Sequence, residues 1–284
     1  MKMDDIHAVW GIIFAGSIST MTRLDPELTV ILPCAGSGSR LGLDAPKELY
    51  EILPGVRLID FSLRHIHHYI HSFNKSTPPP LQVVVVTRPW KLSVSDYVQA
   101  QLPQLPVRTI FFNDAYHDWP GSVFSAAPAY SERNIVLLPD SFLAVSANDP
   151  YRDAAGIPLV EVLNHSLSNQ KLVFGAIECN DPMRLKSLGA LYVENKRIMR
   201  FRDKPQCDFH LYNSFWGCFG FKRCIGTQLY EFMLASVKKH SPPISDEPLL
   251  PAAAIPIADY RDLGTWASIE SFRADWSSAN NWSK

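Results

Sequence analysis

The chain has 284 residues, of which 46% are hydrophobic and 19% are charged, so it can bury a full core and is not an intrinsically disordered protein. The 27 basic and 28 acidic side chains leave a net charge of −1, which gives no strong overall attraction to nucleic acid or to an anionic membrane. The five cysteines are scattered and form no C-x-x-C pair. This argues against a disulfide framework and a structural zinc site, and it fits a reducing cytosol.

Residues 1–28 are predicted to be an extension ahead of the fold. The nearest candidate for a membrane span, residues 8–18, falls short of the roughly 18 apolar residues that a span needs. Asp4 and Asp5 precede this run, whereas a signal peptide prefers a basic start. We therefore expect a cytoplasmic protein without a membrane partner, whose residues 29–284 form a single domain.

Strands and helices alternate along the first half of the predicted domain. Apolar runs predict buried strands at residues 29–34, 82–87, 107–112 and 134–139. Helical spacing of apolar residues predicts helices at 58–73, 93–102 and 122–130, the last limited by Pro128. Continuously apolar strands that alternate with helices indicate a parallel sheet covered on both faces.

The second half has a different pattern, with strands joined by short connections. We expect these strands at residues 172–178, 190–193, 198–202 and 216–221, and a helix at 226–239. The predicted fold class is therefore α/β, with a Rossmann-like, mostly parallel mixed sheet flanked by helices and with antiparallel additions in the C-terminal half. Ligands of such sheets bind beyond the carboxyl ends of strands, where a glycine loop, Asn113-Asp114 and Asp140 are found.

The glycine loop follows the first predicted strand. Gly36, Gly38 and Gly42 permit positive φ angles and let backbone N–H groups approach an anion closely. Arg40 and Lys47 add two cations, of which arginine can bind two phosphate oxygens at once. The spacing matches neither the dinucleotide-binding G-x-G-x-x-G nor a Walker A loop. A tight turn with solvated charges is the plain alternative.

The segment AGSGSRLG at residues 35–42, followed by PKEL at 46–49, resembles the signature of the nucleotidyltransferases that make nucleoside-diphosphate sugars and related activated alcohols. The resemblance spans residues 29–272 and continues in order through PGSV at 120–123, LPDS at 138–141, FRDKP at 201–205, NSFWGCFGF at 213–221 and YRDLGT at 260–265. The sequence departs from the family pattern at Pro139, which replaces a glycine, and at Asp203, which replaces a glutamate. The short spacing from the glycine loop to Pro46-Lys47 is closer to the cytidylyltransferases of isoprenoid and teichoic-type precursors.

This resemblance implies the nucleotide-diphospho-sugar transferase fold, with a nucleotide-binding half at residues 29–145 and an acceptor-binding half at 146–284. The implied reaction is Mg²⁺-dependent transfer from a nucleoside triphosphate to a sugar-1-phosphate or similar phosphorylated polyol, with release of pyrophosphate. Two alternatives stay open: a non-catalytic nucleotide-sugar sensor or regulatory subunit, and a cytidylyltransferase for a non-sugar phosphorylated alcohol. A dehydrogenase is disfavoured by the glycine spacing.

The resemblance also implies a role for individual residues. Arg40 and Lys47 would be catalytic, and Asp140 and Asp262 would hold Mg²⁺. The implied nucleotide-binding residues are Ala35, Gly36, Ser37, Gly38, Ser39, Pro120 and Gly121, and the implied acceptor-binding residues are Gly189, Asp203, Lys204 and Asn213. Turn-forming or helix-capping roles are the alternatives for the aspartates, for Gly121 and for Asn213.

A histidine cluster and many aromatic residues are predicted to have no part in this chemistry. His65, His67, His68 and His71 have no acidic or cysteine ligand nearby in sequence, so we expect solvated or stacked rings rather than a metal site. The tryptophans and phenylalanines are expected in the core or in the walls of the acceptor pocket, not as platforms for nucleic acid. A homo-oligomer is left open.

Overall fold

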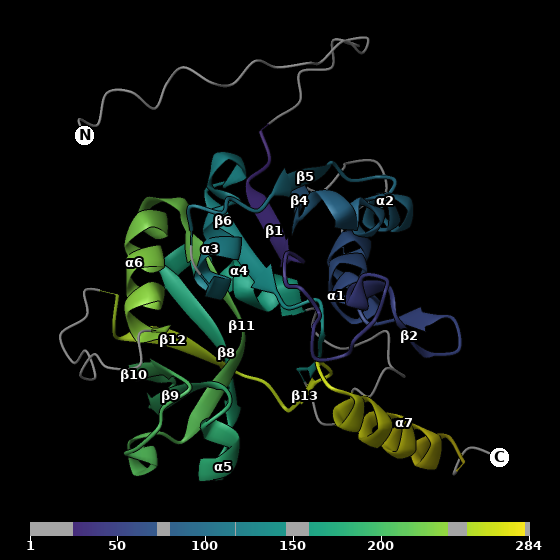
Figure 1. Cartoon of the computed structure of the whole chain (residues 1–284). Helices are drawn as coiled ribbons and strands as arrows, with labels where there is room; N and C mark the ends of the chain where they lie inside the picture. Colours follow the sequence, from purple (N-terminus) through teal and green to yellow (C-terminus); the bar gives the residue numbers. More distant parts are fainter. Residues whose placement is uncertain (1–24, 73–79, 117, 146–158, 238–248, 282–284) are drawn as a thin grey trace.

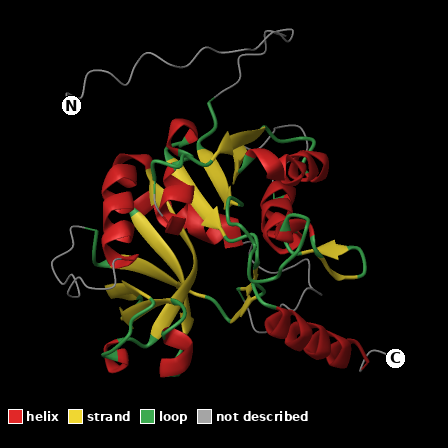
Figure 2. Ribbon diagram, in the orientation of Figure 1, coloured by secondary structure: helices red, strands yellow, loops and turns green. Residues whose placement is uncertain are grey.

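The structure, a computed structural model, describes residues 25–72, 80–116, 118–145, 159–237 and 249–281 (Figure 1). Its centre is a nine-stranded mixed sheet with the strand order β5-β4-β1-β6-β11-β8-β12-β10-β9. Helices flank this sheet, as Figure 2 shows. The predicted α/β class, with a mixed sheet and antiparallel additions, is confirmed.

Four parallel strands form the first half of the sheet. They are β1 (Leu28–Pro33), β4 (Leu81–Thr87), β5 (Val107–Phe111) and β6 (Arg133–Leu137). Strand β1 pairs in parallel with β4 on one side and with β6 on the other, and β4 pairs in parallel with β5. All four lie at the predicted places, and their carboxyl ends therefore share one edge of the sheet.

The second half adds five strands of mixed direction. They are β8 (Leu172–Glu178), β9 (Gly189–Glu194), β10 (Arg197–Asp203), β11 (Ser214–Lys222) and β12 (Ala252–Pro256). Strand β11 runs antiparallel to β6, β8 and β9, so it joins the two halves of the sheet. Strand β12 pairs in parallel with β8 and antiparallel with β10.

Alternating side chains of the central strands bury both faces of the sheet. In β4, Val83 and Val85 pack into one hydrophobic cluster while Val84 and Val86 pack into the other. The first cluster also receives α1 (Asp60–His71), α2 (Leu92–Gln101) and α4 (Leu159–Asn169), and the second receives α3 (Asp118–Phe124) and α6 (Gly226–Val237). The result is three layers, which explains why these strands are apolar throughout.

Smaller elements extend this framework. The short hairpin β2 (Glu51–Leu53) and β3 (Val56–Arg57) follows the glycine loop, and α5 (Pro182–Leu185) precedes β9. A separate antiparallel pair consists of β7 (Ser141–Ala144) and β13 (Asp259–Asp262), and α7 (Trp266–Asn281) follows it. None of the helices in the described ranges is long and apolar enough to cross a membrane.

The predicted helix at 122–130 is wrong in its position. Helix α3 ends at Phe124, and Pro128 lies in the 3₁₀ turn η3 (Ala127–Ala129). Proline has no backbone N–H to continue an α-helix, so the segment turns instead. The sequence alone did not predict the elements α4, α5, α7, β2, β3, β7, β12 or β13. Some of the predicted features lie outside the described residues. They are the C-terminal ends of two predicted helices, at residue 73 and at residues 238–239, the apolar run at 8–18 and most of the expected extension.

Candidate active site

A cavity of about 840 Å³ lies at the carboxyl ends of the parallel strands. Ten of the sequence-predicted residues line it: Ala35, Gly36, Ser37, Arg40, Lys47, Asp140, Gly189, Asp203, Lys204 and Asp262. Gly38 and Ser39 line a neighbouring hollow of about 180 Å³, which shares Gly36, Arg40 and Lys47 with the main cavity. The fold thus brings residues from both halves of the chain to one place.

The glycine loop begins directly after β1. Gly38 and Gly42 have φ angles of +70° and +60°, which other residues adopt only with strain. Within the described part of the chain, no group accepts a hydrogen bond from the backbone amides of residues 35–40. A run of unpaired amides beside a cavity can bind an anion, as the glycine pattern predicts.

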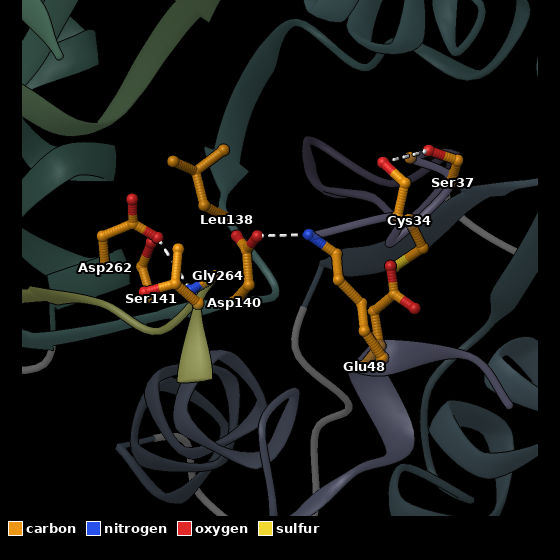
Figure 3. A network of polar contacts seen from close by, with 12 residues as sticks. Cys34, Ser37, Glu48, Leu138, Asp140, Ser141, Asp262 and Gly264 are labelled. Atoms are coloured by element: carbon orange, nitrogen blue, oxygen red, sulfur yellow. Dashed lines mark hydrogen bonds and ion pairs between the residues drawn. The ribbon is translucent and has the colours of Figure 1, made fainter. Parts of the chain in front are cut away.

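Lys47 and Asp140 form an ion pair across the cavity, with Lys47 Nζ 2.5 Å from Asp140 Oδ2 (Figure 3). Lys47 is placed by the 3₁₀ turn η1 (Lys47–Leu49), and Asp140 follows β6. Burial lowers the pKa of Lys47, but the charge and hydrogen bond of Asp140 and the charge of Glu48 outweigh it, so the pKa is raised. The ammonium therefore stays charged at neutral pH.

Asp262 reaches the same cavity through the pairing of β13 with β7. Asp262 lies opposite Ser141 in this pairing, and Leu263 N donates to Asp140 O at 2.9 Å. The Asp262 carboxylate accepts a hydrogen bond from Gly264 N through Oδ1 at 2.9 Å (Figure 3). The two predicted metal ligands therefore lie on adjoining segments, although they are far apart in sequence.

Arg40 and Asp262 both lie close to Gly264. A Cβ atom at position 264 would be 2.9 Å from Arg40 Nη2 and 2.9 Å from Asp262 Oδ1. A side chain here would therefore push the guanidinium or the carboxylate away. The absence of a side chain lets a cation from the glycine loop and an anion from β13 face the cavity together.

The donor set at the two aspartates fits Mg²⁺. Asp140 and Asp262 supply hard carboxylate oxygens on adjoining backbone segments that line one cavity. The described residues contain no group of three or more His, Cys, Asp or Glu side chains that could hold a metal ion. Mg²⁺ is usually bound by one or two carboxylates together with substrate phosphates and water, so two aspartates are enough for it.

The far wall of the cavity is formed by β9, β10 and β11. Asp203 is buried, with 8% of its surface exposed, and its backbone N donates to Ser236 Oγ at 2.7 Å. Lys204 follows it with a φ angle of +47°, an uncommon backbone conformation for a residue with a side chain. At Gly189 a Cβ atom would lie 1.8 Å from Trp216 Nε1, so the Trp216 indole fits only against a glycine.

Three of the predicted site residues line neither the cavity nor the neighbouring hollow. Pro120 lines a separate small apolar hollow between α3 and α6, and a Cβ atom at Gly121 would lie 2.6 Å from Tyr116 Cβ. Asn213 bonds through its side chain to both backbone groups of Val193, at 2.9 Å and 2.8 Å. In this structure Gly121 and Asn213 therefore serve packing and strand register, while Trp119 and Ser122 beside Pro120 and Gly121 line the cavity.

Several cavity residues were missed by the sequence reading. Arg88, directly after β4, donates through Nε to Ala35 O at 3.0 Å, and its guanidinium lies 4.6 Å from the Phe112 ring centre and 5.3 Å from that of Trp90. Its position at the carboxyl end of a predicted parallel strand could have identified Arg88 as a cavity residue, because ligands bind at that edge of such sheets. A second missed group is the buried ion pair of Glu48 with Lys91, with Nζ 2.7 Å from Oε1.

The histidine cluster lies on α1, away from the cavity lining. His65 is buried, and the His67 and His71 ring centres are 6.5 Å apart. Burial, with smaller effects from Arg64 and His68, lowers the pKa of His65 from 6.5 to about 3. His65 is therefore an uncharged core residue, which differs from the solvated or stacked ring that the sequence led us to expect.

Comparison with known proteins gives a structural likeness without close sequence similarity. No family model and no curated protein matches the sequence. Among solved structures, a UDP-glucose pyrophosphorylase complexed with UDP-glucose superposes with a TM-score of 0.64 at 15% identity, covering 88% of this chain and 98% of the other. A UTP-bound UGPase from Acinetobacter baumannii superposes with a TM-score of 0.61 at 15% identity, covering 86% of this chain and 90% of the other. An inositol-1-phosphate CTP transferase from T. maritima superposes with a TM-score of 0.56 at 16% identity, covering 86% of this chain and 91% of the other. At these identities the likeness establishes the fold of the chain.

Proposed function

We propose that the protein is a Mg²⁺-dependent nucleotidyltransferase that joins a nucleoside triphosphate to a sugar-1-phosphate or similar phosphorylated polyol and releases pyrophosphate. The observation that carries this proposal is the convergence of Arg40, Lys47, Asp140, Asp262 and the unpaired loop amides on one cavity. The solved structures of the same fold bear names that include UDP-glucose, UTP and inositol-1-phosphate CTP transfer. These names support the reaction class for this chain.

In the proposed reaction, a phosphate oxygen of the acceptor attacks the α-phosphorus of the nucleotide. A new P–O bond forms as the bond to the β-phosphate breaks, and pyrophosphate leaves with the bonding electrons. Both reactants are polyanions, so alignment and charge stabilisation supply most of the acceleration. Alignment alone can lower the barrier by about 7–11 kcal/mol.

The nucleotide half contributes cations and N–H donors. The amides of residues 35–40 bind the triphosphate, and Arg40 stabilises the charge that develops on the leaving pyrophosphate. Lys47, held in the cavity by Asp140 and charged because its pKa is raised, contacts the α-phosphate region. Asp140 and Asp262 would hold Mg²⁺, which polarises the α-phosphate and aligns the attacking and leaving groups when bound.

The acceptor half contributes the opposite wall. Lys204 neutralises the acceptor phosphate, and the Asp203 carboxylate accepts hydrogen bonds from acceptor hydroxyls. Gly189 leaves the space in which the Trp216 indole forms part of this wall. The nucleotide half is residues 29–145 and the acceptor half is residues 146–284 in this proposal.

The test is pyrophosphate release from each nucleoside triphosphate combined with a panel of sugar-1-phosphates and polyol phosphates. We expect Arg40→Ala and Asp140→Asn to lower turnover by orders of magnitude, with unchanged circular dichroism. Arg133→Ala is the matched control, because Arg133 lies at the opposite end of β6 from Asp140 and forms a surface ion pair with Glu27. The proposal would be overturned if no substrate combination released pyrophosphate, or if either active-site variant kept full activity. Calorimetric binding of a nucleotide sugar without turnover would favour the sensor alternative.

A further inference from the structure

Lys91 is a buried cation directly behind the glycine loop. It ends the 3₁₀ turn η2 (Pro89–Lys91) after β4 and has 4% of its surface exposed. Its Nζ donates to Cys34 O at 2.6 Å, to Gly36 O at 2.9 Å and to Glu48 Oε1 at 2.7 Å. An ammonium group has three donors, so all three are used here.

The cations at 88 and 91 bind three successive carbonyl groups of the loop. Lys91 Nζ donates to the carbonyl oxygens of Cys34 and Gly36, and Arg88 Nε donates to the carbonyl oxygen of Ala35 at 3.0 Å. In a planar trans peptide the carbonyl of one residue points opposite to the N–H of the next. The N–H groups of Ala35 and Ser37 therefore point away from Lys91, and both residues line the cavity.

Glu48 neutralises the buried charge of Lys91 and connects the Lys91 site to Lys47. Glu48 is fully buried, and its charge compensates that of Lys91. It is the neighbour of Lys47, and its backbone O accepts from Ile59 N at 3.0 Å. Figure 3 draws the Glu48 carboxylate beside Cys34, and Lys91 Nζ donates to both residues. One buried pair thus connects the glycine loop to the segment that carries the cavity lysine.

We propose that Lys91, compensated by Glu48, is a positioning residue that orients the amides of Ala35 and Ser37 toward the triphosphate. This inference rests on the proposed function, because it assigns those amides to the nucleotide phosphates. Without Lys91, the loop carbonyls lose their donor in a segment that contains Gly36 and Gly38, whose peptides rotate readily. A carbonyl turned into the cavity repels phosphate where an N–H would bind it.

The first test replaces both charges together, in Lys91→Met with Glu48→Leu, so that no uncompensated charge is left in the interior. We expect the KM for the nucleoside triphosphate and the Kd for inorganic tripolyphosphate to rise at least tenfold. The KM for the acceptor should change less than twofold. Leu163→Ala, a core change in α4 at a fully buried residue, is the control for lost stability and should leave all three values near those of the wild type.

A conservative pair, Lys91→Arg with Glu48→Asp, keeps the cation and the anion and approximately the combined length. Its nucleotide KM should lie between that of the wild type and that of the Met/Leu pair. A folded Met/Leu variant with wild-type KM and Kd would overturn the positioning role while leaving the proposed function intact.

A second measurement needs no variant. In the wild-type protein, the Ala35 and Ser37 amide resonances should shift when tripolyphosphate is added, whereas amides of β8 should not. Unmoved Ala35 and Ser37 resonances in a protein that binds tripolyphosphate by calorimetry would overturn the inference. A wild-type protein that binds neither nucleoside triphosphate nor tripolyphosphate would instead remove the proposed function itself.

Discussion

Gly36 and Gly38 lie two positions apart in one loop but are held by different constraints. Gly38 has a φ angle of +70°, and a Cβ there would touch Lys47 Cγ at 3.5 Å, whereas a Cβ at Gly36 would meet nothing within 4 Å. Gly38→Ala should therefore lower the free energy of unfolding by about 1–2 kcal/mol, the usual cost of a left-handed conformation. Gly36→Ala, the matched control, should change it by less than about 0.5 kcal/mol. Urea denaturation checks both, and equal losses would contradict the argument.

His65 gives the protein a predicted sensitivity to acid. Its pKa is lowered from 6.5 to about 3 in the folded state, first by burial and then by Arg64 and His68. Between these two pH values the unfolded chain binds a proton that the folded chain does not bind. The free energy of unfolding should therefore fall, by up to about 1.4 kcal/mol per pH unit, as the pH drops below about 6.5, with no further loss from this group below about 3.

The variant His65→Gln isolates this effect, because it removes the titrating ring and keeps a polar side chain beside the backbone of Leu143, which hydrogen-bonds His65. Denaturant unfolding measured from pH 7 to pH 4 should give a flatter pH dependence for the variant than for the wild type. Parallel curves would show that His65 is not responsible.

Helix α7 is attached to the rest of the protein by aromatic packing. The Phe272 ring lies 5.5 Å from Phe61 of α1 and 5.5 Å from Phe142 of β7, and Phe272 is 6% exposed. Because β7 pairs with the strand that carries Asp262, loss of this packing should affect stability and turnover together. Phe272→Ala should lower the free energy of unfolding by about 3–5 kcal/mol.

The control for this change is Phe111→Ala, since Phe111 is 51% exposed at the end of β5. A surface change of this kind should remain within about 0.5 kcal/mol of the wild type. Thermal melting and pyrophosphate release are the two measurements. A Phe272→Ala protein that melts like the Phe111→Ala protein would contradict the packing argument.

The elements that sequence could predict are those whose signal is local. Strand β4 contains four consecutive valines, and α6 shows helical spacing of its apolar residues, so both could be placed from their own residues. Strands β7 and β13 are four residues each and become recognisable only through their pairing with one another. The glycine loop and both aspartates lie in short sequence motifs, so they could be chosen from the sequence. Lys91 lies in no such motif and could not be chosen. Its partners Cys34, Gly36 and Glu48 lie more than forty residues away in the chain.

At the scale of the whole molecule, the proposed metal ion would be bound at one edge of the sheet and would not be needed to hold the fold together. Its protein ligands would be Asp140 and Asp262, and the core clusters consist of apolar side chains. Chelation with EDTA should therefore abolish pyrophosphate release while leaving the far-ultraviolet circular dichroism and melting temperature within experimental error. Added Mg²⁺ should restore turnover. A large drop in melting temperature on chelation would show that a metal ion has a structural role.

Strand β11 has a mechanical consequence. It pairs with β6 of the parallel half and with β8 and β9 of the other half, so main-chain hydrogen bonds continue without a break from the first half of the sheet to the second. A hinge rotation of one half of the sheet against the other would break several main-chain hydrogen bonds at once, so we expect the two halves to move as one body. For the proposed reaction we therefore expect motion in side chains and in segments outside the sheet, and the distance between the two walls of the cavity would limit the length of the molecules that it can bind.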